Sequence, residues 1–199
     1  MEVSALLDAM ALAERLKTVT RHSWLSSGRQ ESVAEHSWRM ALMACLMADE
    51  FPGLDIAKTV RMCLFHDLGE AFTGDIPVFE KNAAHEVREA QLLDAWVASQ
   101  PEPQRRELAA LYAELAAGES PEARLCKALD KLEVTDQHNR ADLSTWIPLE
   151  YTLNLTHGTA QTAWHPYLQA VKAAINAQTR EKLQAAGRRP GGQPEAIAP

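Results

Sequence analysis

Residues 63–70 read Cys63-Leu64-Phe65-His66-Asp67-Leu68-Gly69-Glu70, so an apolar run leads directly into three polar side chains. Helical spacing puts Asp67 and Glu70 on the same stripe as Cys63, where core residues are expected. A buried charge is stable only when it is paired or bound to a cation. Imidazole nitrogens and carboxylate oxygens are common ligands of divalent transition metals. The segment therefore predicts half of a metal site.

Two other predicted helices supply the remaining ligands. Ser32 and Glu35 form a capping-box pattern, which starts a helix whose apolar stripe contains His36. Asp130 lies in the apolar stripe of a helix predicted over residues 120–140. Taken singly, such a histidine indicates a core residue and such an aspartate an ion pair. Together they predict one site for a divalent transition metal, namely Mn, Co, Fe, Ni or Zn, with four ligands: His36, His66, Asp67 and Asp130.

The bulk composition excludes several classes of function. The chain has 199 residues, 46% hydrophobic and 24% charged, which is typical of a globular protein. A net charge of −7 argues against binding to a nucleic acid polymer or an anionic membrane, because both require a basic face. We find no signal-peptide pattern and no apolar stretch long enough to span a membrane. Three scattered cysteines in apolar patterns indicate buried, reduced thiols and a cytoplasmic protein.

Helical patterns cover most of the chain, and we see no convincing alternating strand pattern. The fold class predicted is all-α, a single-domain helical bundle over residues 1–186. The C-terminal residues 187–199 are rich in Gly and Pro and are expected to form a flexible tail. The helices are expected at residues 4–17, 32–51, 54–70, 80–99, 104–117, 120–140 and 159–186, with a polar loop at 18–28 and irregular structure at 141–158.

Arg21 and Asp75 have ordinary interpretations from the residues alone. A single arginine in a polar loop is usually solvated. Asp75 follows Gly74 in a predicted turn, where an aspartate commonly bonds to its own backbone. Neither residue is assigned a function on this basis.

The ordered set of motifs resembles the HD-domain superfamily of metal-dependent phosphohydrolases, and within it the branch of 5′-deoxynucleotidases. The matching strings include Glu31–Ser37, His66–Glu70, Gly74–Ile76 and Leu129–Lys131, together with Arg21 and Trp24. They fall in the family's order over roughly the first 140 residues. An isolated His-Asp pair is a weak signal, whereas the whole ordered set is specific.

The resemblance implies an HD-type fold and an enzyme that removes the 5′-phosphate from (deoxy)nucleoside 5′-monophosphates. It implies that His36, His66, Asp67 and Asp130 hold one divalent metal. Glu70 would position or deprotonate the attacking water, and Asp75 would assist proton transfer and contact the sugar or leaving group. Arg21 would bind the 5′-phosphate. The family's members are commonly homodimers, so a homodimer is also implied.

Two positions depart from the bacterial members of this branch. Some of those have Trp directly after the phosphate-binding Arg, where this chain has His22 and its nearest Trp is Trp24. A Thr of the bacterial loop is replaced by Val78. In these respects the chain is more similar to the eukaryotic type, and its preference for a deoxy sugar is left open.

Three rival functions remain at this stage. One is an HD phosphohydrolase for a cyclic nucleotide, an alarmone or a nucleoside triphosphate; against the cyclic dinucleotide class, no Gly-Tyr-Pro follows the His-Asp pair. A second is a non-enzymatic, metal-stabilised helical interaction module, which gives no role to Glu70 and Asp75. A third, a di-iron oxygenase, needs further histidines, and His85 is the one other His near the middle helices.

Overall fold

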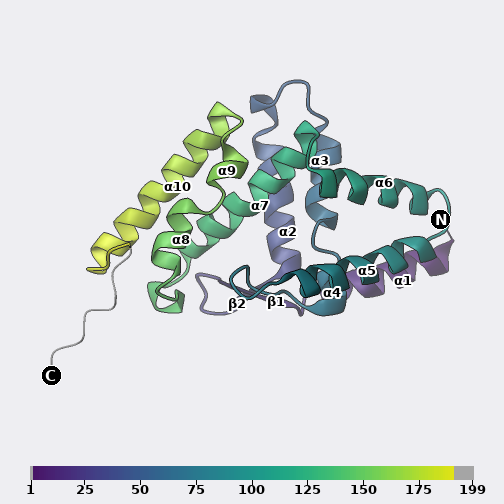
Figure 1. The fold of residues 1–199 in the computed structure, drawn as a ribbon, viewed down its shortest axis with the longest axis horizontal. Coiled ribbons are helices and arrows are strands. Elements are labelled where there is room, and N and C mark those ends of the chain that lie inside the picture. The colour runs from purple at the N-terminus through teal and green to yellow at the C-terminus, as the bar shows by residue number, and fades with distance from the viewer. Residues whose placement is uncertain (1, 191–199) are drawn as a thin grey trace. The chain divides into compact units, whose positions relative to one another are not determined.

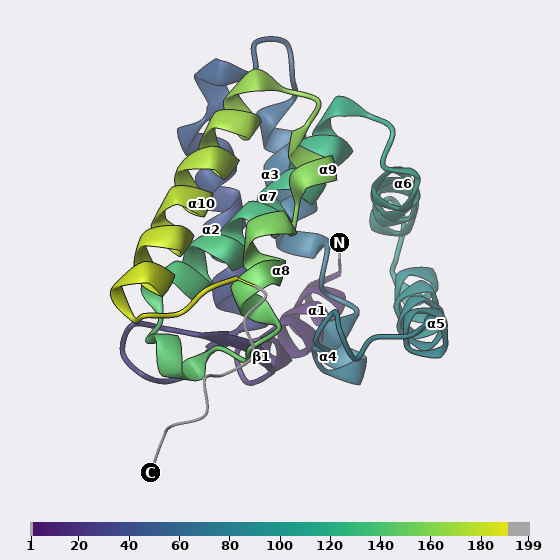
Figure 2. The same ribbon diagram turned by 60° about the vertical axis from the view of Figure 1, so that its left-hand side comes forward.

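The computed structural model describes residues 2–190 and confirms the all-α fold class, with one small hairpin besides the helices (Figures 1 and 2). The described residues divide into two compact units. The first comprises residues 2–22 and 30–127, and the second comprises residues 23–29 and 128–190. One domain over residues 1–186 stays a prediction. Most of the predicted tail lies outside the described residues.

The first unit contains these elements: α1 (Val3–Arg15), most of the hairpin strands β1 (Thr20–Trp24) and β2 (Gln30–Ser32), α2 (Val33–Leu46), the 3-10 turn η1 (Ala48–Glu50), α3 (Ile56–Phe65), α4 (Glu70–Thr73), α5 (Ala83–Ser99), α6 (Gln104–Ala117) and the start of α7 (Pro121–Arg140). α2 packs against α3, and α5 contacts both α4 and α6. The predicted outer helix is confirmed, because Val97 is the buried residue of α5.

A compact apolar cluster supports the loop that follows α3. Leu12 and Leu16 of the α1 region meet Val33, Leu68 and Ala71 in one buried group. Leu68 stands between the polar residues Asp67 and Glu70 in the sequence. Burying Leu68 anchors this turn in the core and so fixes the backbone that carries its two polar neighbours.

The predicted helix over residues 54–70 is wrong in one respect, because the structure breaks it. α3 ends at Phe65, and α4 begins at Glu70. Between them, Leu68 N donates to Phe65 O at 3.1 Å and Glu70 N donates to Asp67 O at 3.0 Å. These contacts span three residues rather than four, so the chain tightens into turns. Asp67 and Glu70 fall at helical spacing from Cys63, which is why the sequence suggested one helix.

A second correction concerns the polar loop predicted at residues 18–28. Part of it is β1, which pairs with β2 in a two-stranded sheet. Gly28 adopts φ +85° in the connection, a conformation that glycine allows. The strands lack alternating apolar residues, so the pattern search had no signal for them.

The second unit holds the later part of α7 with η2 (Leu143–Thr145), α8 (Glu150–Thr156), α9 (Thr159–Thr162) and α10 (Pro166–Ala185). α10 packs against α8 and α9, as Figure 2 shows. Within the unit, Lys172 Nζ donates to Asn154 O at 2.9 Å. The prediction of irregular structure over residues 141–158 is wrong for α8.

Two remaining expectations concern the cysteines and membrane-spanning helices. Cys63 and Cys126 are buried and form no disulfide, as expected, but Cys45 is exposed, which corrects the prediction for that residue. Among the described residues, no helix combines the length and apolar character needed to cross a membrane.

Candidate metal and phosphate site

His66 is oriented by the last turn of α3. Its ring Nδ1 lies 2.8 Å from Cys63 O. A carbonyl oxygen only accepts hydrogen bonds, so Nδ1 carries the proton and donates it. A histidine that binds a metal commonly donates from one ring nitrogen to a carbonyl in this way while its other ring nitrogen faces the metal. His66 Nε2 lies 3.0 Å from Asp67 Oδ2.

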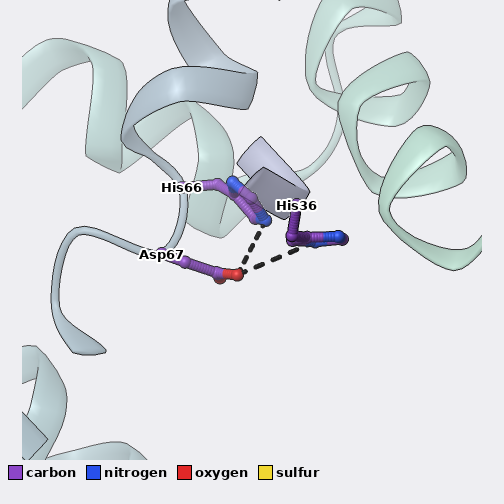
Figure 3. A group of neighbouring side chains, drawn as sticks. All are labelled: His36, His66 and Asp67. Carbon is purple, nitrogen blue, oxygen red and sulfur yellow. Dashed lines mark ion pairs between the residues drawn. The ribbon is translucent and has the colours of Figure 1, made fainter. Parts of the chain in front are cut away.

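His36 reaches the same carboxylate from α2. The capping box predicted at the start of this helix is present, because Ser32 Oγ accepts from Glu35 N and the Glu35 side chain accepts from Ser32 N. The His36 side chain is fully buried, and its Nε2 lies 3.9 Å from Asp67 Oδ2. Dashed lines in Figure 3 mark the ion pairs that join this oxygen to His66 and His36.

These three side chains match the requirements of a divalent metal. One potential ligand atom from each of His36, His66 and Asp67 lies within 4.8 Å of the other two. Ligands at about 2.0–2.2 Å from a tetrahedral metal are themselves roughly 3–4 Å apart. The set offers two imidazole nitrogens and one carboxylate oxygen, which suit a borderline transition metal. The structure therefore brings together three of the four predicted ligands.

Asp67 is ionised in this setting. Burial acts to raise its pKa, but the charge and hydrogen bond of His66, with further contributions from Arg21 and His36, outweigh burial and hold the pKa well below its usual range. Asp67 is thus ready to act as an anionic ligand.

Glu70 is the buried carboxyl beside this group. Its exposed fraction is 5%, and its Oε2 atom has no hydrogen-bond partner among the described residues. Burial first, and then the charges of Asp67 and Asp75, raise the pKa of Glu70 to about 9. A buried, unsatisfied carboxyl among other acids is the local signature of a site that a cation stabilises.

Asp75 follows Gly74, the C-cap residue of α4, as the sequence predicted. Burial is the main cause that raises the pKa of Asp75, and Asp67 adds to it, although Arg21 opposes both. Asp75 Oδ1 lies 3.8 Å from Arg21 Nη1. The structure thus places the Asp75 side chain next to Arg21.

Arg21 lies on β1 and faces three carboxylates. Its Nη1 donates to Asp67 Oδ2 at 3.3 Å, and its Nε lies 3.7 Å from Glu31 Oε2. The side chain is only 11% exposed, so the solvated alternative is wrong. Glu31, on β2, was assigned no function from the sequence. Its position directly before the N-cap Ser32 was the available signal, but the hairpin that brings it to Arg21 was not predicted.

His22, one of the two departures from the bacterial pattern, is tied to the segment after Asp75. Its ring packs edge-to-face on Phe79, with centroids 5.4 Å apart and planes at 89°. Val78, the other departure, is exposed. Both positions lie within the first unit.

Asp130 belongs to the second unit. Its Oδ2 lies 2.7 Å from Lys131 Nζ, and its side chain is 21% exposed. Gly158 packs closely on Lys131, because a Cβ built on Gly158 would lie 2.6 Å from Lys131 Cβ. The role of Asp130 as the fourth metal ligand stays a prediction.

Comparisons with known proteins agree with this geometry. Residues 13–172 match the HD domain family. The chain is 30% identical over 195 residues to human 5′-deoxynucleotidase HDDC2, covering 94% of this chain and 92% of the human protein. It is 32% identical to the 5′-deoxynucleotidase hdd1 of Schizosaccharomyces pombe, over 62% of this chain and 65% of that protein.

A solved structure is also similar, that of a predicted metal-dependent phosphohydrolase from Magnetospirillum magnetotacticum MS-1. The TM-score is 0.78 at 29% identity, with 94% of this chain and 96% of that chain covered. The extent of the family match and the relatives of similar length show that the chain belongs to the HD domain family.

Proposed function

We propose that this protein is a metal-dependent phosphohydrolase that removes the 5′-phosphate from (deoxy)nucleoside 5′-monophosphates. The single observation that carries the proposal is the convergence of His36, His66 and Asp67, with Arg21 donating to the same Asp67 oxygen that both histidines face. The proposed metal ligands and the proposed phosphate-binding arginine thus lie around the same Asp67 oxygen. Similarity to proteins named 5′-deoxynucleotidase supports the choice of substrate.

The proposed cofactor is one divalent transition metal, held by His36, His66 and Asp67, with Asp130 as the fourth ligand. Nitrogen and oxygen donors suit Mn, Co, Fe, Ni or Zn, and the native metal is not assigned. When bound, such a metal supplies Lewis-acid activation of the attacking water and of a phosphate oxygen.

Arg21 binds and orients the phosphate in this proposal. A planar guanidinium has five N–H donors and takes two phosphate oxygens at once, which fixes both position and orientation. Its neighbours Glu31, Asp67 and Asp75 hold the guanidinium in place before substrate arrives. A preoriented arginine loses less conformational entropy when the phosphate binds.

Glu70 and Asp75 move protons at the reacting bond. Without metal, the pKa of Glu70 is raised to about 9, so the carboxyl holds a proton. A bound cation would favour the ionised form, which can then take a proton from the attacking water. Asp75 also has a raised pKa, so its carboxyl can hold a proton and donate it to the leaving 5′-oxygen. The two groups thus divide the roles of base and acid.

A homodimer and a cytoplasmic location stay predictions that accompany this proposal. We expect no nucleic acid polymer and no membrane among the partners, because the net charge is −7. A single domain over residues 1–186 is likewise proposed.

A nucleotide panel separates this function from its rivals. We would follow phosphate release with Mn, Co, Zn or Mg from 5′-monophosphates, 3′-monophosphates, cyclic nucleotides and triphosphates. Release from the 5′-monophosphates alone supports the proposal. Turnover restricted to cyclic nucleotides or triphosphates would assign another HD phosphohydrolase activity. A folded, metal-loaded sample that hydrolyses no nucleotide would favour the interaction module.

A further inference from the structure

Lys81 stands beside the candidate site but has no role in the mechanism above. It ends the turn that follows Asp75, in which Glu80 N and Lys81 N donate to Pro77 O at 2.8 and 2.9 Å. Asn82 follows directly and caps the start of α5. The Lys81 side chain is 26% exposed, so a ligand can reach it.

Glu89, on α5, holds the Lys81 ammonium group. Lys81 Nζ donates to Glu89 Oε2 at 2.9 Å. An ammonium has three N–H donors, and the part of the chain that the structure describes gives this one no other hydrogen-bond partner. Two donors therefore remain for a ligand.

Glu89 is itself positioned by the backbone of the metal-binding turn. A Cβ built on Gly69 would lie 2.9 Å from Glu89 Cγ and 3.2 Å from its Oε1. The Glu89 side chain thus lies directly across Gly69, the residue before Glu70. The glycine makes this close approach possible, and it links the Lys81–Glu89 pair to the turn that carries Asp67 and Glu70.

Lys81 interacts electrostatically with the same acids. Burial acts to lower the pKa of Lys81, but the bond to Glu89 outweighs it, and Glu70 and Asp67 act with Glu89 to raise the pKa. Lys81 in turn acts to lower the pKa of Asp75. The charge of Lys81 therefore interacts with Asp67, Glu70 and Asp75, the three acids of the proposed reaction site.

We propose that Lys81 is a second phosphate-binding residue of this site and that Glu89 is its positioning residue. A phosphate dianion that enters a cluster of Asp67, Glu70 and Asp75 meets strong repulsion, and the charge of Arg21 is already shared among three carboxylates. Lysine is a common phosphate ligand that acts as a point charge. This inference rests on the proposed function, since it assigns a contact to that function's substrate.

The test measures binding of inorganic phosphate to the Mn-loaded protein by equilibrium dialysis, which needs no turnover. Lys81→Met removes the charge and keeps most of the side-chain volume, and Lys81→Arg keeps the charge. Lys58→Met is the matched control, because Lys58 Nζ also pairs with a carboxylate, Glu114 Oε1 at 2.7 Å, in the same unit. We expect Lys81→Met to weaken binding about tenfold, which corresponds to about 1.4 kcal/mol, because a charge-assisted hydrogen bond to the phosphate is lost.

Lys81→Arg should stay within a few fold of the wild type, and Lys58→Met should match it. Glu89→Asp keeps the negative charge but shortens the side chain, so it should weaken phosphate binding by a smaller factor. Unchanged binding in Lys81→Met overturns the inference. Equal weakening of phosphate binding in Lys81→Met and Lys81→Arg, with a lower melting temperature in both, would show that Lys81 has a structural role and would also overturn the inference. A wild type that binds no phosphate would overturn it as well.

The two proposals fail separately. If phosphate affinity depends on Lys81 but the wild type hydrolyses no 5′-monophosphate, the binding site stands and the proposed function fails. If the wild type is active and Lys81→Met retains both its phosphate affinity and its KM for the monophosphate, the function stands and the inference about Lys81 fails.

Discussion

Replacing Glu70 with glutamine should change how the stability of the metal-free protein depends on pH. In the folded protein the pKa of Glu70 is raised to about 9, against an ordinary value of 4.5. Between these two values the folded state keeps a proton that the unfolded state releases. The unfolded state thus binds fewer protons, so the free energy of unfolding falls as the pH rises through this window.

The magnitude follows from the same two values. Each pH unit inside the window changes the unfolding free energy by about 1.36 kcal/mol. Between pH 6.5 and 8.0 the wild type should therefore lose about 2 kcal/mol through Glu70. Glutamine does not titrate, so Glu70→Gln should lack this contribution. His157 and Lys172 have lowered pKa values in both proteins, and their contributions cancel in the comparison.

The assay is urea unfolding followed by circular dichroism, with chelator present, for both proteins at pH 6.5 and 8.0. We expect the difference in unfolding free energy between variant and wild type to grow by about 2 kcal/mol from the lower to the higher pH. Adding the metal should reduce the difference, because a cation stabilises the ionised carboxylate. If the unfolding free energies of the two metal-free proteins depended on pH in the same way, Glu70 would not be a buried acid with a raised pKa.

The remaining predictions concern the metal, the phosphate and the fold. Glu70→Gln should lower turnover about 10²- to 10⁴-fold while the metal content measured by mass spectrometry stays unchanged. His66→Ala or Asp67→Asn should lose both turnover and bound metal. Loss of metal in Glu70→Gln would contradict the role of Glu70 as a base. Arg21→Lys keeps the charge but loses the planar fork, so kcat/KM for a 5′-monophosphate should fall about 10- to 100-fold, and an unchanged value would remove Arg21 from phosphate binding. Ser32→Ala should cost about 1 kcal/mol in chemical unfolding because it removes the cap of α2, and no change would show that the capping box does not stabilise the helix.

Helices with strong terminal signals were predictable from the sequence. α2 begins at the Ser32 capping box, and α6 ends before Gly118, which adopts the left-handed conformation. α8 was missed, and its N-cap is Leu149, which makes no side-chain capping bond. Without a cap residue, this short helix has no start signal that a sequence pattern can detect.

The candidate site was predictable where polar residues interrupt apolar stripes. His36, His66 and Asp67 were found in this way, because each occupies a position where a core residue is expected. Contacts that depend on chain reversals were not predictable. Glu31 meets Arg21 through a polar hairpin, and Glu89 meets Lys81 through a turn, so no periodic pattern links either pair.

A metal-dependent 5′-phosphohydrolase can be tested by phosphate release from deoxyadenosine 5′-monophosphate and from its 3′ isomer with the same preparation. The assay compares the Mn-loaded wild type, the chelated wild type and Mn-supplemented His66→Ala. We predict that the Mn-loaded wild type releases phosphate from the 5′ isomer and little from the 3′ isomer. The chelated wild type and His66→Ala should release little phosphate from either isomer. Equal release from both isomers, or full activity in the chelated protein, would contradict it.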